Sequence, residues 1–292
     1  MYSNIEQLIS EAEQTDLFTV IVENEKQLSG KTDEEIWESL KSRWEVMYKS
    51  SHKALYEAQN MVGNLISGQA SKQQKYTEQN GVSGKSFVGQ ELNQMMSYAL
   101  SSSEVNASMG KICAAPTAGA CGIIPAVIQT AANKINASEE LMIKTIAVAA
   151  GFGAVITKNA TVSGAEGGCQ AECGVAAAMA SASVVYMAGG PPKACANACA
   201  ITLMNCMGLV CDPIAGLVQL PCSYRNASQS MNALLSADLA LAGQDPVIPC
   251  DEVIEAMYKV GKKLPAELKE TALGGVATTP KGKMFAEEIL SH

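Results

Sequence analysis

Histidine is nearly missing from this 292-residue chain, which contains only His52 and His292. A zinc centre built on several histidines is therefore excluded, and a nucleophile activated by histidine would have to use one of these two side chains. Aromatic residues make up only 5% of the chain, so small side chains must fill much of the core. The net charge is −8 and no basic cluster is present, which argues against nucleic acid and anionic membranes as partners.

Two further absences concern the cysteines. None of the ten cysteines has the Cys-x2-Cys spacing of zinc ribbons and bacterial ferredoxins. The segment 1–30 contains several acids and no apolar signal core, so we expect no secretory leader and a cytoplasmic location. In such a reducing compartment, many cysteines indicate metal binding or catalysis more often than disulfides.

The charges that are present are unevenly distributed. Residues 1–60 carry twelve acidic and six basic residues, whereas residues 112–222 carry only nine charges and hold nine of the ten cysteines. Hydrophobic residues make up 48% of the chain, which excludes wholesale disorder. We expect a single domain over 1–292, with an acidic helical N-terminal part at 1–70 and a nearly uncharged centre.

The hydrophobic spacing predicts helices, and the centre lacks the alternation typical of strands. Ile5, Leu8 and Ile9 have helical spacing, and Thr32–Glu35 has the form of a capping box that begins a helix. The other expected elements are a helix over 45–67, a loop over 71–89, a helix over 90–102 and four Ala-rich helices over 125–132, 141–155, 174–187 and 194–210. Helices this apolar on all sides must be buried, so the expected fold class is all-α, a compact bundle of buried Ala/Gly-rich helices.

A membrane protein is the main alternative to this fold. The uncharged residues between Glu172 and Lys193 are numerous enough to span a bilayer. They are rich in alanine and serine, however, and no aromatic belt or basic flank frames them. The mean hydropathy of the whole chain is only +0.08. We therefore expect buried helices and no membrane partner.

Three cysteines lie where elements are expected to begin or end. Cys169 ends the Gly-rich turn 163–169, Cys211 precedes Asp-Pro, and Cys222 follows Leu-Pro. Such positions present side chains to a pocket. Three thiolates around an iron–sulfur cluster would leave one iron without a protein ligand, able to act as a Lewis acid. For the other seven cysteines, packing as small apolar side chains is the favoured interpretation.

Two more segments carry possible chemistry. Pro and Gly break the segment 111–125 around Thr117, which makes it either a connector or a nest of backbone N–H groups that grips a carboxylate. Lys158 and Glu166 are rare charges in the apolar centre. Burying them is costly unless they pair with each other or act on a substrate.

Three long stretches together resemble one family. They are KICAAPTAGACGIIPAV (111–127), KNATVSGAEGGCQAECGVAAAMA (158–180) and GLVCDPIAGLVQLPC (208–222). In this order they are similar to the signatures of the iron–sulfur-dependent L-serine dehydratase alpha chain. The resemblance covers about 84–275, the motif-bearing core. It implies an all-α catalytic domain around a 4Fe-4S cluster, conversion of L-serine to pyruvate and ammonia, and no use of pyridoxal phosphate.

The resemblance also implies roles for individual residues. The implied cluster ligands are Cys169, Cys211 and Cys222, and the implied substrate contacts are Pro116, Thr117, Ala118 and Gly119. A base must remove the α-proton of serine. Lys158 is our first choice, because burial would favour its neutral amine; Ser163, Glu166 and a base from another chain are the alternatives.

The chain departs from the family pattern in two respects. Single-chain members have an extra N-terminal domain and end in a cysteine that caps the cluster, whereas this sequence ends at 289–292 with Ile-Leu-Ser-His. We therefore expect the two-chain type, with a separate beta chain as partner. Ala118 stands where some members have asparagine. Two other functions stay open: a cysteine desulfidase-like lyase, and a non-catalytic iron–sulfur module in which Cys173 joins Cys169 as a ligand.

Overall fold

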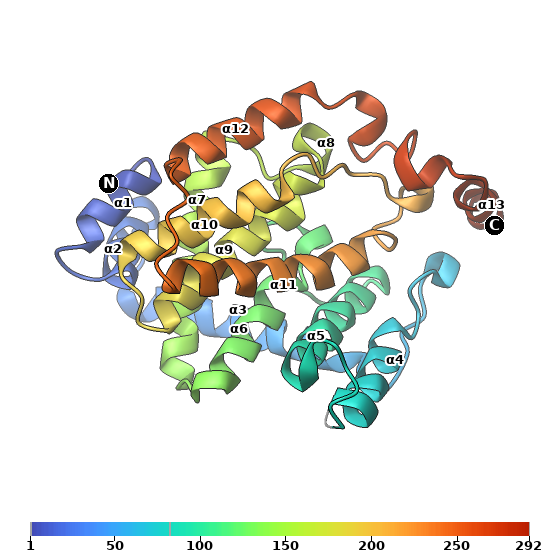
Figure 1. The fold of residues 1–292 in the computed structure, drawn as a ribbon, viewed down its shortest axis with the longest axis horizontal. Helices are drawn as coiled ribbons and strands as arrows, with labels where there is room; N and C mark the ends of the chain where they lie inside the picture. The colour runs from blue at the N-terminus through green and yellow to red at the C-terminus, as the bar shows by residue number, and fades with distance from the viewer. Residues whose placement is uncertain (1, 82, 292) are drawn as a thin grey trace.

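The computed structural model describes residues 2–81 and 83–291, which fold into thirteen α-helices joined by short 3-10 and π segments (Figure 1). The first seven are α1 (Ile5–Ala12), α2 (Leu17–Ser29), α3 (Asp33–Lys53), α4 (Gln69–Tyr76), α5 (Gly89–Ala107), α6 (Ile123–Ile135) and α7 (Glu139–Asn159). The others are α8 (Gly164–Gly167), α9 (Val175–Met187), α10 (Pro192–Cys206), α11 (Cys222–Leu241), α12 (Cys250–Lys263) and α13 (Pro280–Leu290). Within the described residues, the only extended pairing is one isolated bridge, Cys211 to Lys269. The all-α expectation is confirmed.

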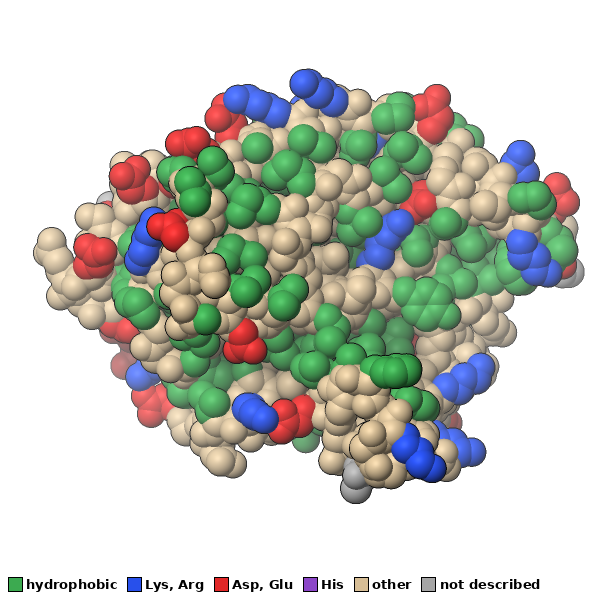
Figure 2. All heavy atoms as spheres, viewed as in Figure 1, with side chains coloured by type: hydrophobic (Ala, Val, Ile, Leu, Met, Phe, Trp, Pro, Cys, Tyr) green, Lys and Arg blue, Asp and Glu red, His purple; other side chains and the backbone are tan. Residues whose placement is uncertain are grey.

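Helix α9 is the central element. Every residue of α9 except Tyr186 is buried, and the helix packs against α6, α7, α10 and α11. Its small side chains let these four helices approach closely and fill the core without large voids. Charged side chains lie mostly toward the edge of the face in Figure 2, around a largely uncharged centre. The four central helices are thus confirmed, although α10 ends at Cys206, before an extended Met207 and a left-handed Gly208.

The predicted capping box begins α3. Thr32 Oγ1 accepts a hydrogen bond from the Glu35 backbone N–H at 3.3 Å, and Glu35 Oε2 accepts one from the Thr32 N–H at 2.9 Å. This reciprocal pair satisfies two backbone donors that the first helical turn leaves free. The sequence therefore predicts the start of α3 correctly.

Two expectations for the N-terminal half are wrong. Helix α3 ends at Lys53, and residues 54–68 form an irregular segment instead of more helix. Conversely, most of the loop expected over 71–89 is helical, since α4 is followed directly by a π segment at Thr77–Gly81. Although the sequence of α4 is mostly polar, Ala70 and Gln74 are buried on the side that packs against α5.

A buried carboxylate explains why the helix stops. Glu104 of α5 has no exposed surface. Its oxygens accept hydrogen bonds from the backbone N–H groups of Gln59 (3.2 Å), Gly68 (3.1 Å) and Ala70 (2.7 Å). A continuous helix would need those N–H groups for its own ladder. Glu104 therefore holds the irregular segment 54–68 in place from the inside.

We expect Glu104→Gln to lower the free energy of unfolding by about 2–3 kcal/mol, because hydrogen bonds to charged groups are strong and the new amide would turn an NH₂ toward a backbone donor. Chemical denaturation measures this change. The control is Glu91→Gln on the same helix, where an exposed ion pair with Lys134 (60% and 65% exposed) should contribute at most about 1 kcal/mol. Equal losses for the two variants would contradict the role of Glu104.

In the part of the chain that the structure describes, one helix, α7, is long and apolar enough to cross a membrane. Of its most apolar 18-residue window, 61% is buried inside the protein, and the helix packs against α2, α3 and α9. The core helices of soluble proteins pass the same test, so this finding is a weak indication of a membrane span.

The C-terminal part returns across the molecule. In Figure 1, α12 runs along the top and the chain then descends to α13 at the far right. Helix α13 packs against the short 3-10 turns Val62–Asn64 and Ile214–Gly216. This path brings the segment after α12 alongside residues 211–216, next to the site described below.

Candidate active site

The three boundary cysteines converge. Cys169 lies between α8 and the π segment Gln170–Gly174, Cys211 follows α10, and Cys222 is the first residue of α11. All three side chains are buried. They are near enough to interact electrostatically, since after burial itself a negative charge on Cys169 is among the causes that raise the pKa of Cys211 and of Cys222. Three separate segments thus place thiols around one site.

Glu172 lies among these cysteines. Cys211 Sγ donates a hydrogen bond to Glu172 Oε2 at 3.7 Å, and the ligand atoms of Glu172, Cys211 and Glu270 all lie within 4.8 Å of one another. A Cβ on Gly164 would lie 2.5 Å from Glu172 Oε2 and 3.2 Å from Cys211 Sγ. A Cβ on Gly119 would lie 3.3 Å from Glu172 Oε1. Glycine at both positions therefore lets the carboxylate approach the backbone.

A short extended pairing positions Glu270. The Cys211 N–H donates to Leu268 O at 2.9 Å, and the Glu270 N–H donates to Cys211 O at 2.8 Å. These two bonds form the isolated bridge between Cys211 and Lys269. The segment after α12 therefore completes one wall of the site.

Asn226 ties the Gly-rich loop to the start of α11. Its Nδ2 donates to Gly119 O at 2.7 Å and to Cys222 O at 2.9 Å, and its Oδ1 accepts from the Gly122 N–H at 2.9 Å. The side chain is buried. A single amide thus fixes the loop that follows Thr117 relative to Cys222.

The Thr117 hydroxyl faces the site. Its Oγ1 is buried and has no well-aligned hydrogen-bond partner among the described residues. The Thr117 hydroxyl lies next to the Glu172 carboxyl group. Burial raises the pKa of Glu172, and the Thr117 hydroxyl lowers it. Because its contact with Glu172 is not a well-aligned hydrogen bond, the buried Thr117 hydroxyl keeps the capacity to bind a polar group of a ligand.

Arg225 supplies the positive charge near the thiols. It pairs with Asp212 at 2.8 Å, and its Nη1 donates to Val210 O at 2.7 Å. Asp212 in turn accepts a hydrogen bond from the Val276 N–H at 2.7 Å. The pair is largely buried, with side-chain exposures of 15% for Arg225 and 3% for Asp212. This network braces the residues on either side of Cys211.

The thiols differ in acidity. A hydrogen bond with Cys173 lowers the pKa of Cys169, and the nearby Arg225 adds to this effect against the cost of burial. Burial raises the pKa of Cys222 to about 12, and burial together with Glu172 raises that of Cys211 further. Of the three thiols, only Cys169 has a lowered pKa. The other two must lose a proton when they bind a metal, as thiol ligands do.

The three residues predicted for proton transfer, Lys158, Ser163 and Glu166, differ in their exposure to solvent. Lys158, in the last turn of α7, and Glu166, in α8, are exposed and do not pair with each other. The burial that motivated the choice of Lys158 is therefore not observed. Ser163 is half-buried and directly precedes Gly164, whose backbone lies against Glu172. Of the implied substrate contacts, Ala118 is exposed, whereas Pro116, Thr117 and Gly119 are half-buried.

The donor set fits an iron–sulfur cluster. Such clusters are held by cysteine thiolates, and here three buried thiols come from three separate segments. The buried Thr117 hydroxyl and the Glu172 carboxylate lie beside them with capacity for further contacts. Sequence reasoning missed Glu172 and Glu270. Glu172 could have been found as a lone acid three residues after Cys169 in a charge-poor stretch, but no local signal marks Glu270.

Comparison with known proteins identifies the family. A model of the family "Serine dehydratase alpha chain" matches residues 12–277. The chain is 44% identical over 291 residues to a probable L-serine dehydratase alpha chain of Bacillus subtilis, covering 99% of this chain and 95% of that protein. It is 46% identical over 276 residues to the L-serine dehydratase alpha chain of Peptoniphilus asaccharolyticus, covering 94% and 93%. An L-serine dehydratase of Haemophilus influenzae is 34% identical over 280 residues, which cover 94% of this chain but only 61% of that protein. The chain therefore belongs to the serine dehydratase alpha chain family.

Proposed function

We propose that this chain is the catalytic alpha chain of an L-serine dehydratase, an ammonia-lyase that converts L-serine to pyruvate and ammonia. The convergence of Cys169, Cys211 and Cys222 around Glu172 carries the proposal. The names of the similar alpha chains support the substrate. In this proposal a 4Fe-4S cluster is held by the three cysteines, and no pyridoxal phosphate takes part.

The reaction removes water from serine. The α-proton and the β-hydroxyl leave, and the resulting 2-aminoacrylate becomes an imine that water hydrolyses to pyruvate and ammonia. Hydroxide is a poor leaving group; a cluster held by Cys169, Cys211 and Cys222 would supply a Lewis-acidic iron for the hydroxyl. The remaining tasks fall to the protein: holding the carboxylate and the ammonium group, and accepting the α-proton.

The chain's own residues match these tasks. Thr117 and the neighbouring backbone, fixed by Asn226, provide donors for the serine carboxylate. The Glu172 carboxylate provides an acceptor for the ammonium group. Ser163, next to Gly164, is the group we retain for proton transfer. Lys158 and Glu166 are set aside because both side chains are exposed.

A partner chain completes the proposal. Two similar proteins are named alpha chains, and the similar L-serine dehydratase of Haemophilus influenzae is longer than this chain. We infer a separate beta chain that corresponds to the part of that relative which this chain does not cover. A cytoplasmic location and an absence of nucleic-acid partners stay predictions.

An anaerobic EPR experiment tests the function. The chain is reconstituted with iron and sulfide, reduced, and measured before and after addition of L-serine, alone and with its beta chain. We expect a cluster signal that shifts with L-serine, and pyruvate formation in the complex. A signal indifferent to serine in both samples would favour the non-catalytic module, and sulfide released from L-cysteine without pyruvate from L-serine would favour the desulfidase-like lyase.

A further inference from the structure

A cavity lies away from Cys169, Cys211 and Cys222. It has a volume of about 430 Å³, is partly open to solvent, and is lined mainly by α2, α3, α7 and the segment 113–116. This volume is within the range of about 300–1,000 Å³ that is typical of small-molecule sites. None of the cysteines that converge on Glu172 lines it. The cavity is therefore a separate candidate for ligand binding.

Small residues of α7 form its floor. Ala150, Ala154 and Thr157 line the cavity at spacings of four and three residues, so they lie on one face of the helix. All three side chains are exposed, so this part of α7 is open to a ligand. Ile36 and Met47 of α3 add an apolar wall. The interior thus suits an aliphatic side chain.

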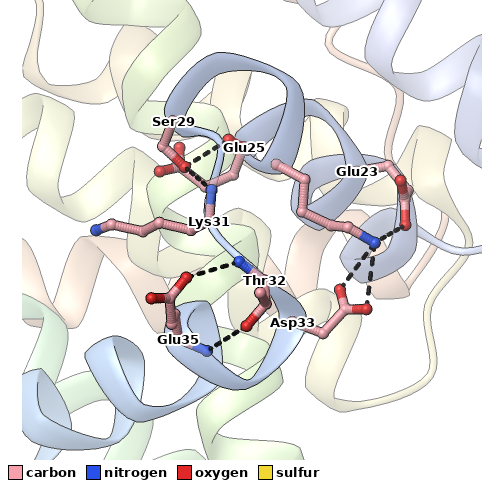
Figure 3. A network of polar contacts seen from close by, with 8 residues as sticks. Glu23, Glu25, Ser29, Lys31, Thr32, Asp33 and Glu35 are labelled. Atoms are coloured by element: carbon pink, nitrogen blue, oxygen red, sulfur yellow. Dashed lines mark hydrogen bonds and ion pairs between the residues drawn. The ribbon is translucent and has the colours of Figure 1, made fainter.

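Two positive charges stand at the rim. Lys31 and Arg43 line the cavity, are exposed, and have no carboxylate partner among the described residues. Lys26, not Lys31, pairs with Glu23 and Asp33. In Figure 3 the Lys31 side chain extends away from these two acids. Arg43 donates only to a backbone carbonyl of its own helix, that of Ser39. These two cations are available to a carboxylate.

Acceptors for a positive group are also present. Asn24 lines the same cavity; its amide lies near the Tyr2 hydroxyl, and its buried Oδ1 has no well-aligned hydrogen-bond partner among the described residues. The Glu25 side chain lines the cavity next to it and makes no ion pair in the described part of the chain. A buried acceptor without a donor is unfavourable, so Asn24 is suited to an N–H group of a ligand.

We propose that this cavity is a binding site for an apolar α-amino acid. The carboxylate of the ligand would pair with Arg43 and Lys31, its ammonium group would donate to Asn24 and Glu25, and its side chain would lie on the alanines of α7. The binding itself does not depend on the proposed function. Because the segment 113–116 continues directly into Thr117, any effect on serine turnover would act through that segment, and this consequence does rest on the proposed function.

Calorimetric titration of the full chain with L-leucine tests the proposal. We expect saturable binding at one site per chain. Two probes of similar shape define the chemistry: 4-methylpentanoate lacks the ammonium group, and 3-methylbutylamine lacks the carboxylate. Each should bind at least about tenfold more weakly, because each loses its charge-assisted hydrogen bonds.

Two pairs of variants locate the site. Ala154→Leu fills the floor and should abolish binding, whereas Ala242→Leu, at the exposed end of α11, should not change it. Arg43→Gln should weaken binding by about tenfold, whereas Lys41→Gln on the same helix, which does not line the cavity, should not. Absence of saturable binding would overturn the proposal, as would binding that neither Ala154→Leu nor Arg43→Gln reduces. Equal affinity for 4-methylpentanoate would overturn the amino-acid assignment. None of these outcomes requires the cluster, so they are distinct from failure of the dehydratase proposal.

Discussion

Replacing Cys211 with serine is expected to leave the chain folded but to remove both its iron–sulfur absorbance and its turnover of L-serine. Cys211 is held at the centre of the site by backbone hydrogen bonds to Leu268 and Glu270, which the substitution does not touch. The hydroxyl group of serine is a much weaker ligand for iron than a thiolate, because soft thiolates are what iron–sulfur clusters require. Iron and sulfide content, the visible spectrum after anaerobic reconstitution, and pyruvate formation with the beta chain measure the effect.

Cys250→Ser is the matched control. Cys250 is buried at the start of α12 and is not one of the converging cysteines, so the variant should keep its cluster and its activity. Far-ultraviolet circular dichroism should show the same helix content for both variants. A Cys211→Ser protein that retains the full cluster content would contradict the ligand assignment.

Glu172→Gln should lower kcat/KM for L-serine by about a hundredfold, because a neutral amide no longer forms a charge-assisted contact with the ammonium group of the substrate. The substitution keeps the shape of the side chain, which matters where Gly119 and Gly164 leave room for little more than the carboxylate. Steady-state pyruvate formation by the complex of both chains, normalised to cluster content, measures the change.

Glu267→Gln is the control for this prediction. Glu267 is exposed and lies in the same C-terminal segment as Glu270, so its loss should leave kcat/KM within about twofold, as is usual for a surface substitution. If Glu172→Gln loses no more activity than Glu267→Gln, the proposed role of Glu172 is wrong. If Glu172→Gln instead loses its cluster, Glu172 acts in holding the metal rather than the substrate.

The helices of the core could be predicted from the sequence because their burial is nearly complete. An Ala-rich run such as α9 has no exposed face, so composition and length alone identify it. The irregular segment 54–68 could not be predicted, since it depends on the buried Glu104 of α5, many residues later in the chain. A contact of that range leaves no periodic signal in the segment that it controls.

The candidate site could also be predicted from the sequence only in part. Cys169, Cys211 and Cys222 were identifiable because each stands within two residues of a glycine or proline that interrupts a helix, and the structure places them at element boundaries. Glu270 reaches the site only through the pairing of its segment with Cys211, which nothing near either residue predicts. The single-domain description of 1–292, the roles of individual site residues and the cluster itself stay predictions.

The pairing of Cys211 with the segment 268–270 has a consequence for biosynthesis. A ribosome makes Cys169, Cys211 and Cys222 first, then α11 and α12, and only afterwards the residues that pair with Cys211 and close the site. Until then the growing chain carries its thiols without their final enclosure, exposed to oxidants and to stray metal ions. For the proposed cluster, we therefore expect delivery of iron and sulfide to follow completion of the segment after α12, on the released chain rather than on the nascent one.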